Sequence, residues 1–276
     1  MPSLPVVLIL KVASLQVGGF HGYVTRTDLR VALDIADIAD AVTLAHYRSA
    51  GLQTESKGDL TPVTEADRAT ERAIRDALNQ ARPEDSIAGE EYGETGTSTR
   101  QWIIDPIDAT FNYVRGLPVW ATLIALEDVD GVAVGVVSAP AIGHRWWAGR
   151  QLGAFRNGNT MRVSTIDSIE QATLSFNSLE THEQHGMGAH AAELSRRCAL
   201  TRGFGDFLSF MFLADGAVDI VTEPIAHVWD LAPLDIIVTE AGGTFTDVDG
   251  THTIRGSNAV ATNGLLHDEV LQIMAR

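Results

Sequence analysis

Cysteine and lysine are the scarcest side chains in this sequence of 276 residues. Cys198 is the only cysteine, which excludes an internal disulfide framework and any zinc site built from several cysteines. Lys11 and Lys57 are the only lysines among 20 basic residues, and 36 acidic residues bring the net charge to −16. A protein that binds nucleic acid needs a basic surface to meet the phosphate backbone. We therefore expect no nucleic-acid partner.

Long hydrophobic runs are also missing, since no stretch approaches the roughly 20 apolar residues of a membrane-spanning helix. The apolar stretch 5–10 follows no basic segment and precedes no small-residue cleavage site, which argues against a signal peptide. We expect a cytoplasmic protein without a membrane partner. Residues 1–26 are expected to be a disordered extension, or to follow from a start codon assigned too far upstream.

The remaining chain has the composition of an ordinary globular protein, with 45% hydrophobic and 20% charged residues. Apolar periodicity predicts helices over residues 28–50, 64–80, 204–216 and 229–243. Runs of β-forming residues predict strands near 102–104, 120–128, 132–140, 145–150, 153–158, 172–178 and 217–224. These strands do not alternate regularly with helices, which favours an α/β fold of mixed sheets layered with helices over a doubly wound sheet.

We expect one compact unit made of two halves. Residues 27–165 form an N-terminal α+β half that carries the metal and phosphate motifs. Residues 166–276 form a C-terminal α/β half that completes the same site.

The most informative segment is "WIIDPIDAT", residues 102–110. Its apolar strand ends at Asp105, and Asp108 follows three residues later. Two carboxylates in one tight turn repel each other and lose hydration, and a hard cation between them relieves both effects. A helix that begins after Asp108 would point the N–H groups of Ala109 and Thr110 outward, as at a phosphate site. The alternative is that Asp108 only caps this helix and Asp105 only shapes the turn.

Three other acidic positions are open to two interpretations. Glu90 follows an apolar strand, so it is either part of a solvated acidic loop or a member of the same metal cluster. Asp67 has capping-box spacing to Thr64, so it either caps a helix or orients a water molecule. Asp230 opens a helix, so it is either an N-cap or a metal ligand from the second half. Glu223 ends a strand that faces the same region.

Together, "GEE" at 89–91, "DPID-x-T" at 105–110 and "WD…EAGG" at 229–243 resemble the inositol monophosphatase family over roughly residues 28–276. The resemblance implies a layered αβαβα sandwich of the inositol monophosphatase and fructose-1,6-bisphosphatase type. It also implies a homodimer, dependence on magnesium and sensitivity to lithium. The metal ligands that it implies are Glu90, Asp105, the Ile107 carbonyl, Asp108 and Asp230.

The resemblance further implies that Asp67, Thr110 and Glu90 form the catalytic set, with Asp67 and Thr110 orienting the attacking water. The amides of Ala109 and Thr110 would cradle the phosphate. We expect metal-assisted hydrolysis with two or three Mg²⁺ ions, for which Mn²⁺ can substitute, and no covalent phospho-enzyme. One ion would lower the pKa of a bound water, and another would stabilise the leaving oxygen.

Longer segments, among them "DLTPVTEADRATE", "NYVRGLPVWATLIAL" and "GFGDFLSF", resemble the histidinol-phosphatase branch of this family. That branch removes phosphate from L-histidinol phosphate in histidine biosynthesis. The substrate carries a cationic amine and an imidazole, which the carboxylates of Asp206 and Glu223 would pair with. Inositol-cleaving relatives carry a substrate-binding glutamate at the position of Glu223. An inositol monophosphatase, or a phosphatase of broad specificity for small phosphorylated metabolites, therefore stays open.

Two residues of the active-site turn depart from the family pattern. Ala109 stands where the family has glycine, and Phe111 replaces a polar residue. A helical φ at Ala109 would make this change cheap, whereas a methyl group against the phosphate would impair binding and rate. The alternative from another functional class is a protein that binds a phosphorylated metabolite without turning it over because of Ala109.

Overall fold

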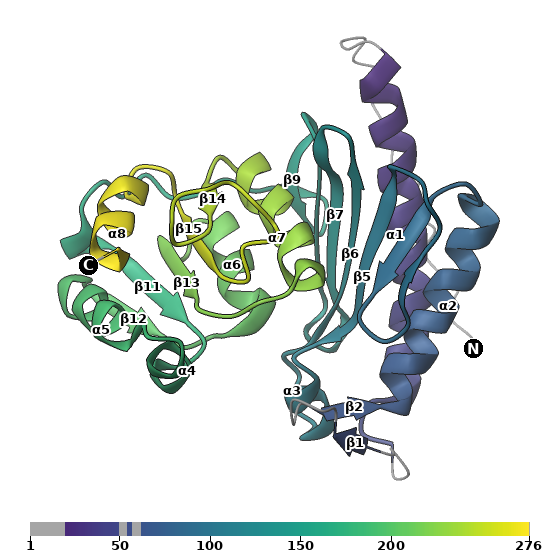
Figure 1. Ribbon diagram of the computed structural model, residues 1–276, viewed down its shortest axis with the longest axis horizontal. Helices are drawn as coiled ribbons and strands as arrows, with labels where there is room; N and C mark the ends of the chain where they lie inside the picture. Colours follow the sequence, from purple (N-terminus) through teal and green to yellow (C-terminus); the bar gives the residue numbers. More distant parts are fainter. Residues whose placement is uncertain (1–19, 50–53, 57–61, 276) are drawn as a thin grey trace, which may run out of the picture.

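In a computed structural model of the chain, the described residues are 20–49, 54–56 and 62–275. They stack in five layers in the order helix, sheet, helix, sheet, helix (Figure 1). The predicted α/β sandwich with mixed sheets is therefore confirmed. Within the described part of the chain, no helix combines the length and apolar character needed to cross a membrane.

The first outer layer contains helices α1 (Phe20–His46) and α2 (Glu65–Ala81). Their buried side chains, such as Ile35 and Ile74, pack on one face of the larger sheet. Helix α1 begins eight residues before the predicted start at 28 and ends before the predicted 50. The reason is that Asp28 does not cap the helix: it is 2% exposed inside it and forms ion pairs with Arg82 (2.9 Å) and Arg100 (3.1 Å). Residues 1–19, most of the expected extension, and residue 50, the predicted helix end, lie outside the described residues.

The larger sheet has 8 strands in the order β10-β9-β8-β7-β6-β5-β3-β4. All its neighbours run antiparallel except β3 and β5, which are parallel. The strands are β3 (Ser86–Gly89), β4 (Gly93–Thr95), β5 (Gln101–Asp108), β6 (Ala121–Asp128), β7 (Gly131–Ala139), β8 (His144–Gly149), β9 (Gly153–Arg156) and β10 (Asn159–Thr160). The predicted hairpin of residues 145–158 is the β8–β9 pair.

The middle layer consists of α6 (Asp206–Ala214) and α7 (Val228–Glu240), which lie between the two sheets (Figure 1). Their apolar residues form one core with side chains from both sheets, for example Ile103 of the larger sheet and Val221 of the smaller one. Gly135 of β7 explains how closely α7 approaches, because a Cβ there would lie 2.4 Å from Ile236 Cγ2. This close packing holds the middle of α7 against the larger sheet.

The smaller sheet has 5 strands in the order β12-β11-β13-β15-β14 and is covered on its outer face by α4, α5 and α8. Strand β11 is parallel to both β12 and β13, and the other pairs are antiparallel. The elements are β11 (Thr173–Phe176), α4 (Leu179–Gln184), α5 (Gly188–Arg197), β12 (Leu200–Arg202), β13 (Ile220–Glu223), β14 (Thr244–Thr246), β15 (Ala259–Thr262) and α8 (His267–Met274).

Five short elements complete the fold. Strands β1 (Thr54–Ser56) and β2 (Pro62–Thr64) form an antiparallel pair beside the start of α2. Helix α3 (Thr110–Val114) follows β5 directly. Two 3-10 turns, η1 (Pro140–Ile142) and η2 (Ile169–Gln171), lie at strand ends.

Candidate active site

The C-terminal end of β5 carries Asp105 and Asp108, the two carboxylates that the sequence predicted to bind a cation. Side chains alternate across a strand, so Asp105 lies on the same face as Ile103, toward the middle helix layer. The register of β5 against β6 shifts between Asp105 and Asp108, which brings both acids into one turn. Asp105 Oδ1 accepts a hydrogen bond from the amide of Ile107 at 2.9 Å. Asp108 Oδ2 accepts one from the amide of Phe207 at 3.0 Å, across the boundary between the two halves.

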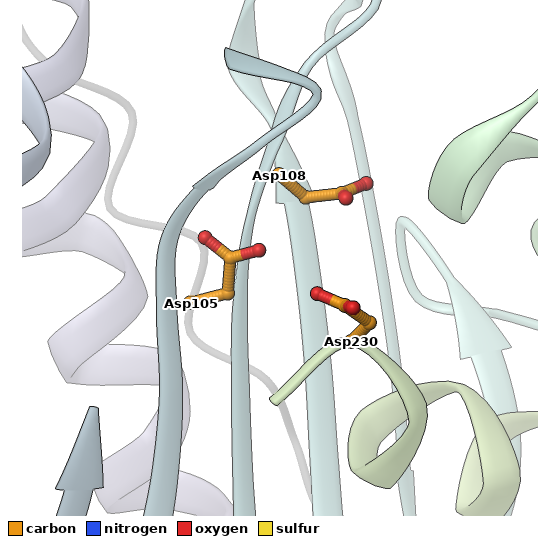
Figure 2. Close-up of side chains that lie close together, drawn as sticks. All are labelled: Asp105, Asp108 and Asp230. Carbon is orange, nitrogen blue, oxygen red and sulfur yellow. The ribbon is translucent and has the colours of Figure 1, made fainter. Parts of the chain in front are cut away.

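Asp230 approaches the same point from the first turn of α7. Its Oδ2 accepts a hydrogen bond from the amide of His227 at 2.7 Å, so Asp230 closes a capping box from position N3, and the N-cap itself is His227. Figure 2 shows that Asp105, Asp108 and Asp230 nevertheless direct their carboxyl groups into a common space. One oxygen from each lies within 4.8 Å of the others. Capping and ligand geometry thus coexist in this residue.

The pKa values of the three aspartates indicate whether a cation fits this cluster. Burial raises the pKa of Asp105 well above its ordinary value, and neighbouring negative charges, that of Glu90 first, raise it further. Burial and the charge of Asp206 do the same to the pKa of Asp108. Burial likewise raises the pKa of Asp230 to about 7. Crowded, desolvated carboxyl oxygens are the donor set that a hard divalent cation requires, so the site fits such an ion.

Glu90 lies beside this cluster, in the turn after β3. Its amide donates to the carbonyl of Ile104 at 3.2 Å, which extends the parallel pairing of β3 with β5. Its side chain hydrogen-bonds to Asp105, and this bond contributes to the raised pKa of Asp105. The structure therefore brings Glu90 to the edge of the cluster, outside the compact group of three aspartates.

Asp67, Thr110 and the Ile107 carbonyl meet on the opposite side of the β5 turn. Asp67 is 1% exposed, and its Oδ2 accepts from the amide and hydroxyl of Thr64 at 2.8 and 2.6 Å, so the capping box exists. Its other oxygen, Oδ1, is 3.5 Å from Thr110 Oγ1, which also donates to the Ile107 carbonyl at 2.9 Å. Burial raises the pKa of Asp67 to about 6. Asp67 thus combines a capping oxygen with one that faces the site.

Ala109 adopts the left-handed conformation, with φ 62° and ψ 47°, as the N-cap of α3. The φ is therefore not the right-handed helical one that would make the change from glycine cheap, and alanine adopts this conformation only with strain. The first amides of α3 have no partner inside the helix, so those of Ala109 and Thr110 are available to an anion. Tyr113 anchors the short helix, because its buried hydroxyl donates to the Thr43 carbonyl at 2.7 Å. Phe111 points outward and is 62% exposed.

A pocket of about 110 Å³ adjoins the aspartate cluster and contains both predicted substrate residues, Asp206 and Glu223. Burial raises the pKa of Asp206 to about 6 and that of Glu223 to about 8. Its wall comprises Asp108, Asn177, Thr181, Asp206, Phe207, Phe210, Glu223, Ile225, Ala226, Asp230, Leu231 and Leu234.

Sequence reasoning missed two polar residues of this wall, Asn177 and Thr181. Asn177 Nδ2 donates to Asp206 Oδ1 at 3.4 Å, and Thr181 belongs to the first turn of α4. The only available signal was Ser178, three residues before Thr181, which has N-cap spacing and accepts from the Thr181 amide at 3.0 Å.

The origin of each group separates the site into two parts. Asp67, Glu90, Asp105, Asp108 and Thr110 come from the N-terminal half. The pocket wall comes mainly from the C-terminal half, including Asn177, Thr181, Asp206 and Glu223. Asp230 is the C-terminal contribution to the aspartate cluster.

Comparison with known proteins gives consistent matches over nearly the whole chain. The profile described as "Inositol monophosphatase family" matches residues 25–275. A histidinol-phosphatase of Mycobacterium tuberculosis is 50% identical over 254 residues, which cover 90% of this chain and 97% of that protein. A histidinol-phosphatase of Streptomyces coelicolor is 48% identical over 253 residues, covering 88% and 95%. Among solved structures, the extragenic suppressor protein SuhB of Bartonella henselae superimposes with a TM-score of 0.84 at 28% identity, covering 91% and 99%.

Proposed function

Because this chain belongs to the inositol monophosphatase family, we propose that it hydrolyses L-histidinol phosphate to L-histidinol and phosphate, a step of histidine biosynthesis. The observation that carries the choice of substrate is the pair of buried carboxyl groups, Asp206 and Glu223, in the pocket beside the aspartate cluster. Two acids in one small pocket suit a substrate with a cationic amine and an imidazole. An inositol ring offers neutral hydroxyl groups instead.

The metal requirement of the family is assigned to the carboxylates already described. Asp105, Asp108 and Asp230 would hold Mg²⁺, with Glu90 and the Ile107 carbonyl completing the oxygen donors. When bound, Mg²⁺ or Mn²⁺ would act as a Lewis acid toward phosphate oxygens and would lower the pKa of water. We propose two or three ions, as the resemblance implies.

The residues of the chain itself orient the nucleophile. Asp67 Oδ1 and Thr110 Oγ1 are 3.5 Å apart and are both within reach of one water molecule. The Thr110 hydroxyl proton points to the Ile107 carbonyl, which leaves a lone pair on Oγ1 to accept from that water. Asp67 Oδ1 would accept a hydrogen bond from the second O–H of the water, so the two side chains together would fix its orientation.

The phosphate and the organic part of the substrate are held by different elements. The amides of Ala109 and Thr110, at the N-terminus of α3, would donate to phosphate oxygens. The amine and imidazole would lie against Asp206 and Glu223. We further infer a homodimer, which light scattering of the purified protein tests directly.

The deciding experiment measures phosphate release from L-histidinol phosphate and from inositol monophosphate, each with Mg²⁺ and with a chelator. We expect Mg²⁺-dependent turnover with kcat/KM at least ~100-fold higher for histidinol phosphate, about 2.7 kcal/mol of discrimination. A preference for inositol monophosphate would retain the chemistry but remove the assignment to histidine biosynthesis. Binding without release from either substrate would favour the protein that only binds phosphorylated metabolites.

A further inference from the structure

One face of α2 carries three charged residues at intervals of four, Asp67, Glu71 and Arg75, which a helix stacks above one another. Asp67 belongs to the site described above. Glu71 lies one turn further along and is completely buried, with a side-chain exposure of 0%. A buried carboxylate is retained in a stable fold only when its oxygens are well paired. Its partners therefore indicate what it does.

Glu71 accepts hydrogen bonds from the backbone of the turn that carries Glu90. Its Oε2 accepts from the amide of Glu91 at 2.7 Å, and its Oε1 accepts from the amide of Tyr92 at 3.3 Å. These are the two residues that directly follow Glu90 in the chain. Together with the bond from the Glu90 amide to the Ile104 carbonyl, they fix the backbone on both sides of the Glu90 side chain.

Gly89 provides the space for this carboxylate. A Cβ at residue 89 would lie 2.0 Å from Glu71 Oε1 and 2.4 Å from Glu71 Cδ. The φ of Gly89 is not in the left-handed region, so close approach, and not backbone freedom, is what requires glycine here. Gly89 thus leaves space for the side chain of Glu71, and Glu71 in turn holds the backbone that follows Glu90.

Arg75 neutralises Glu71 and extends the contact to the far end of the turn. Its Nε donates to Glu71 Oε1 at 2.7 Å, and its guanidinium also donates to Thr95 Oγ1 at 3.1 Å and to the Gly93 carbonyl. The pair thus holds the β3–β4 turn at its beginning, through Glu71, and at its end, through Arg75. Charge-assisted hydrogen bonds of this kind are about twice as strong as neutral ones.

We propose that Glu71 is a positioning residue that sets the place of Glu90 in the cation site by holding the two backbone amides that follow it. Glu71 itself does not reach the aspartate cluster, and it acts only through the turn. The proposal rests on the proposed function, because it assumes that Glu90 helps to hold a divalent cation. In this arrangement α2 both carries Asp67 and, through Glu71, holds the turn that contains Glu90.

The test replaces Glu71 with glutamine, which has the same shape but only one acceptor oxygen. One of the three donors on the carboxylate then faces an amide NH₂ group. We expect the Mg²⁺ dissociation constant, measured by calorimetry without substrate, to rise about 10-fold, as is common when a partner of a metal ligand is lost. The Mg²⁺ concentration for half-maximal turnover should rise in parallel, with little change in KM at saturating Mg²⁺. Asp76→Asn is the matched control, since it removes one carboxylate from an exposed position of the same helix and should leave Mg²⁺ binding unchanged.

Two further measurements apply if Glu71→Gln fails to fold. Gly89→Ala displaces the same carboxylate from the strand side and should weaken Mg²⁺ binding similarly. In the unaltered protein, the amides of Glu91 and Tyr92 should exchange with deuterium slowly even in the presence of a chelator. Wild-type Mg²⁺ affinity in a folded Glu71→Gln protein, or rapid exchange at both amides, would overturn the proposal. Neither measurement depends on which phosphate ester is the substrate. The role of Glu71 can therefore be refuted or supported independently of the proposed function.

Discussion

Replacing Ala109 with glycine tests how the active-site turn is built. Ala109 has φ 62° and ψ 47°, a conformation that places the Cβ of an L-residue close to the following carbonyl. Glycine adopts the same conformation without that contact. Because the backbone geometry needed for the turn is already present, the substitution should relieve strain without moving the amides of Ala109 and Thr110.

The expected gain in stability follows from two opposing terms. The left-handed conformation destabilises an L-residue by about 1–2 kcal/mol, and glycine avoids this destabilisation. Glycine gives up roughly 0.5–1 kcal/mol more conformational entropy than alanine on folding. The free energy of unfolding should therefore rise by about 0.5–1 kcal/mol, equivalent to a Tm increase of about 1–2 °C for a protein of this size.

The assay is urea unfolding in a chelator, combined with phosphate release in Mg²⁺. Gln151→Gly is the matched control, since Gln151 also has φ 62° but lies in the β8–β9 turn, away from the site. Both variants should be more stable by similar amounts, with unchanged m-values. Turnover by Ala109→Gly should stay within about threefold of the parent, or about 0.7 kcal/mol. The reasoning is refuted if only the control gains stability, and a 100-fold gain in turnover would identify Ala109 as an impairing residue.

The remaining predictions concern the pocket, the cation and one ion pair. Glu223→Gln should raise KM for histidinol phosphate about 10-fold or more, since a charged hydrogen bond contributes about 1.5–3 kcal/mol, while Mg²⁺ affinity measured by calorimetry stays close to the parent. Mg²⁺ at about 100 times its dissociation constant should raise the free energy of unfolding by about 2.7 kcal/mol over chelator, and an unchanged Tm would contradict a cation site. The hydrogen bond to Asp235 (2.8 Å) raises the pKa of His252, so its stabilisation should be fully present below pH ~6.5 and be lost as pH rises through the folded-state pKa. The difference in unfolding free energy between the parent and His252→Gln should therefore shrink from acidic to alkaline pH.

The parts of the site that lie within one helix or strand could be predicted from the local sequence. Asp105 and Asp108 were recognisable because an apolar strand, a proline and a second acid occur in close succession, although β5 continues through a register shift to Asp108 and does not end at Asp105 as predicted. The capping role of Asp67 was equally readable from its spacing to Thr64, and both its cap and its approach to Thr110 are present. The αβαβα layering followed from the family resemblance, because strand patterns alone predicted only mixed sheets.

Properties that depend on tertiary contacts were not predictable in this way. The left-handed φ of Ala109 is imposed by the turn and the anchoring of α3, and alanine itself favours the opposite hand. Asp28 read as a helix start, whereas its buried pairing with Arg82 and Arg100 allows α1 to continue on both sides of it. The role of Glu71 was not predicted, because its partners include backbone amides whose position in space the helical pattern does not encode.

The division of the site between the two halves has a consequence for how such a protein changes over generations. The groups that we propose to orient water and to hold most of the cation come from the N-terminal half, whereas most of the pocket wall comes from the C-terminal half. Substitutions at Asn177, Thr181 or Glu223 can therefore alter which molecule is admitted while the hydrolytic groups stay intact. Asp230 is the exception, since it belongs both to the C-terminal half and to the aspartate cluster. A substitution there would change the pocket and the cation site together, whereas most other wall residues can change the pocket alone.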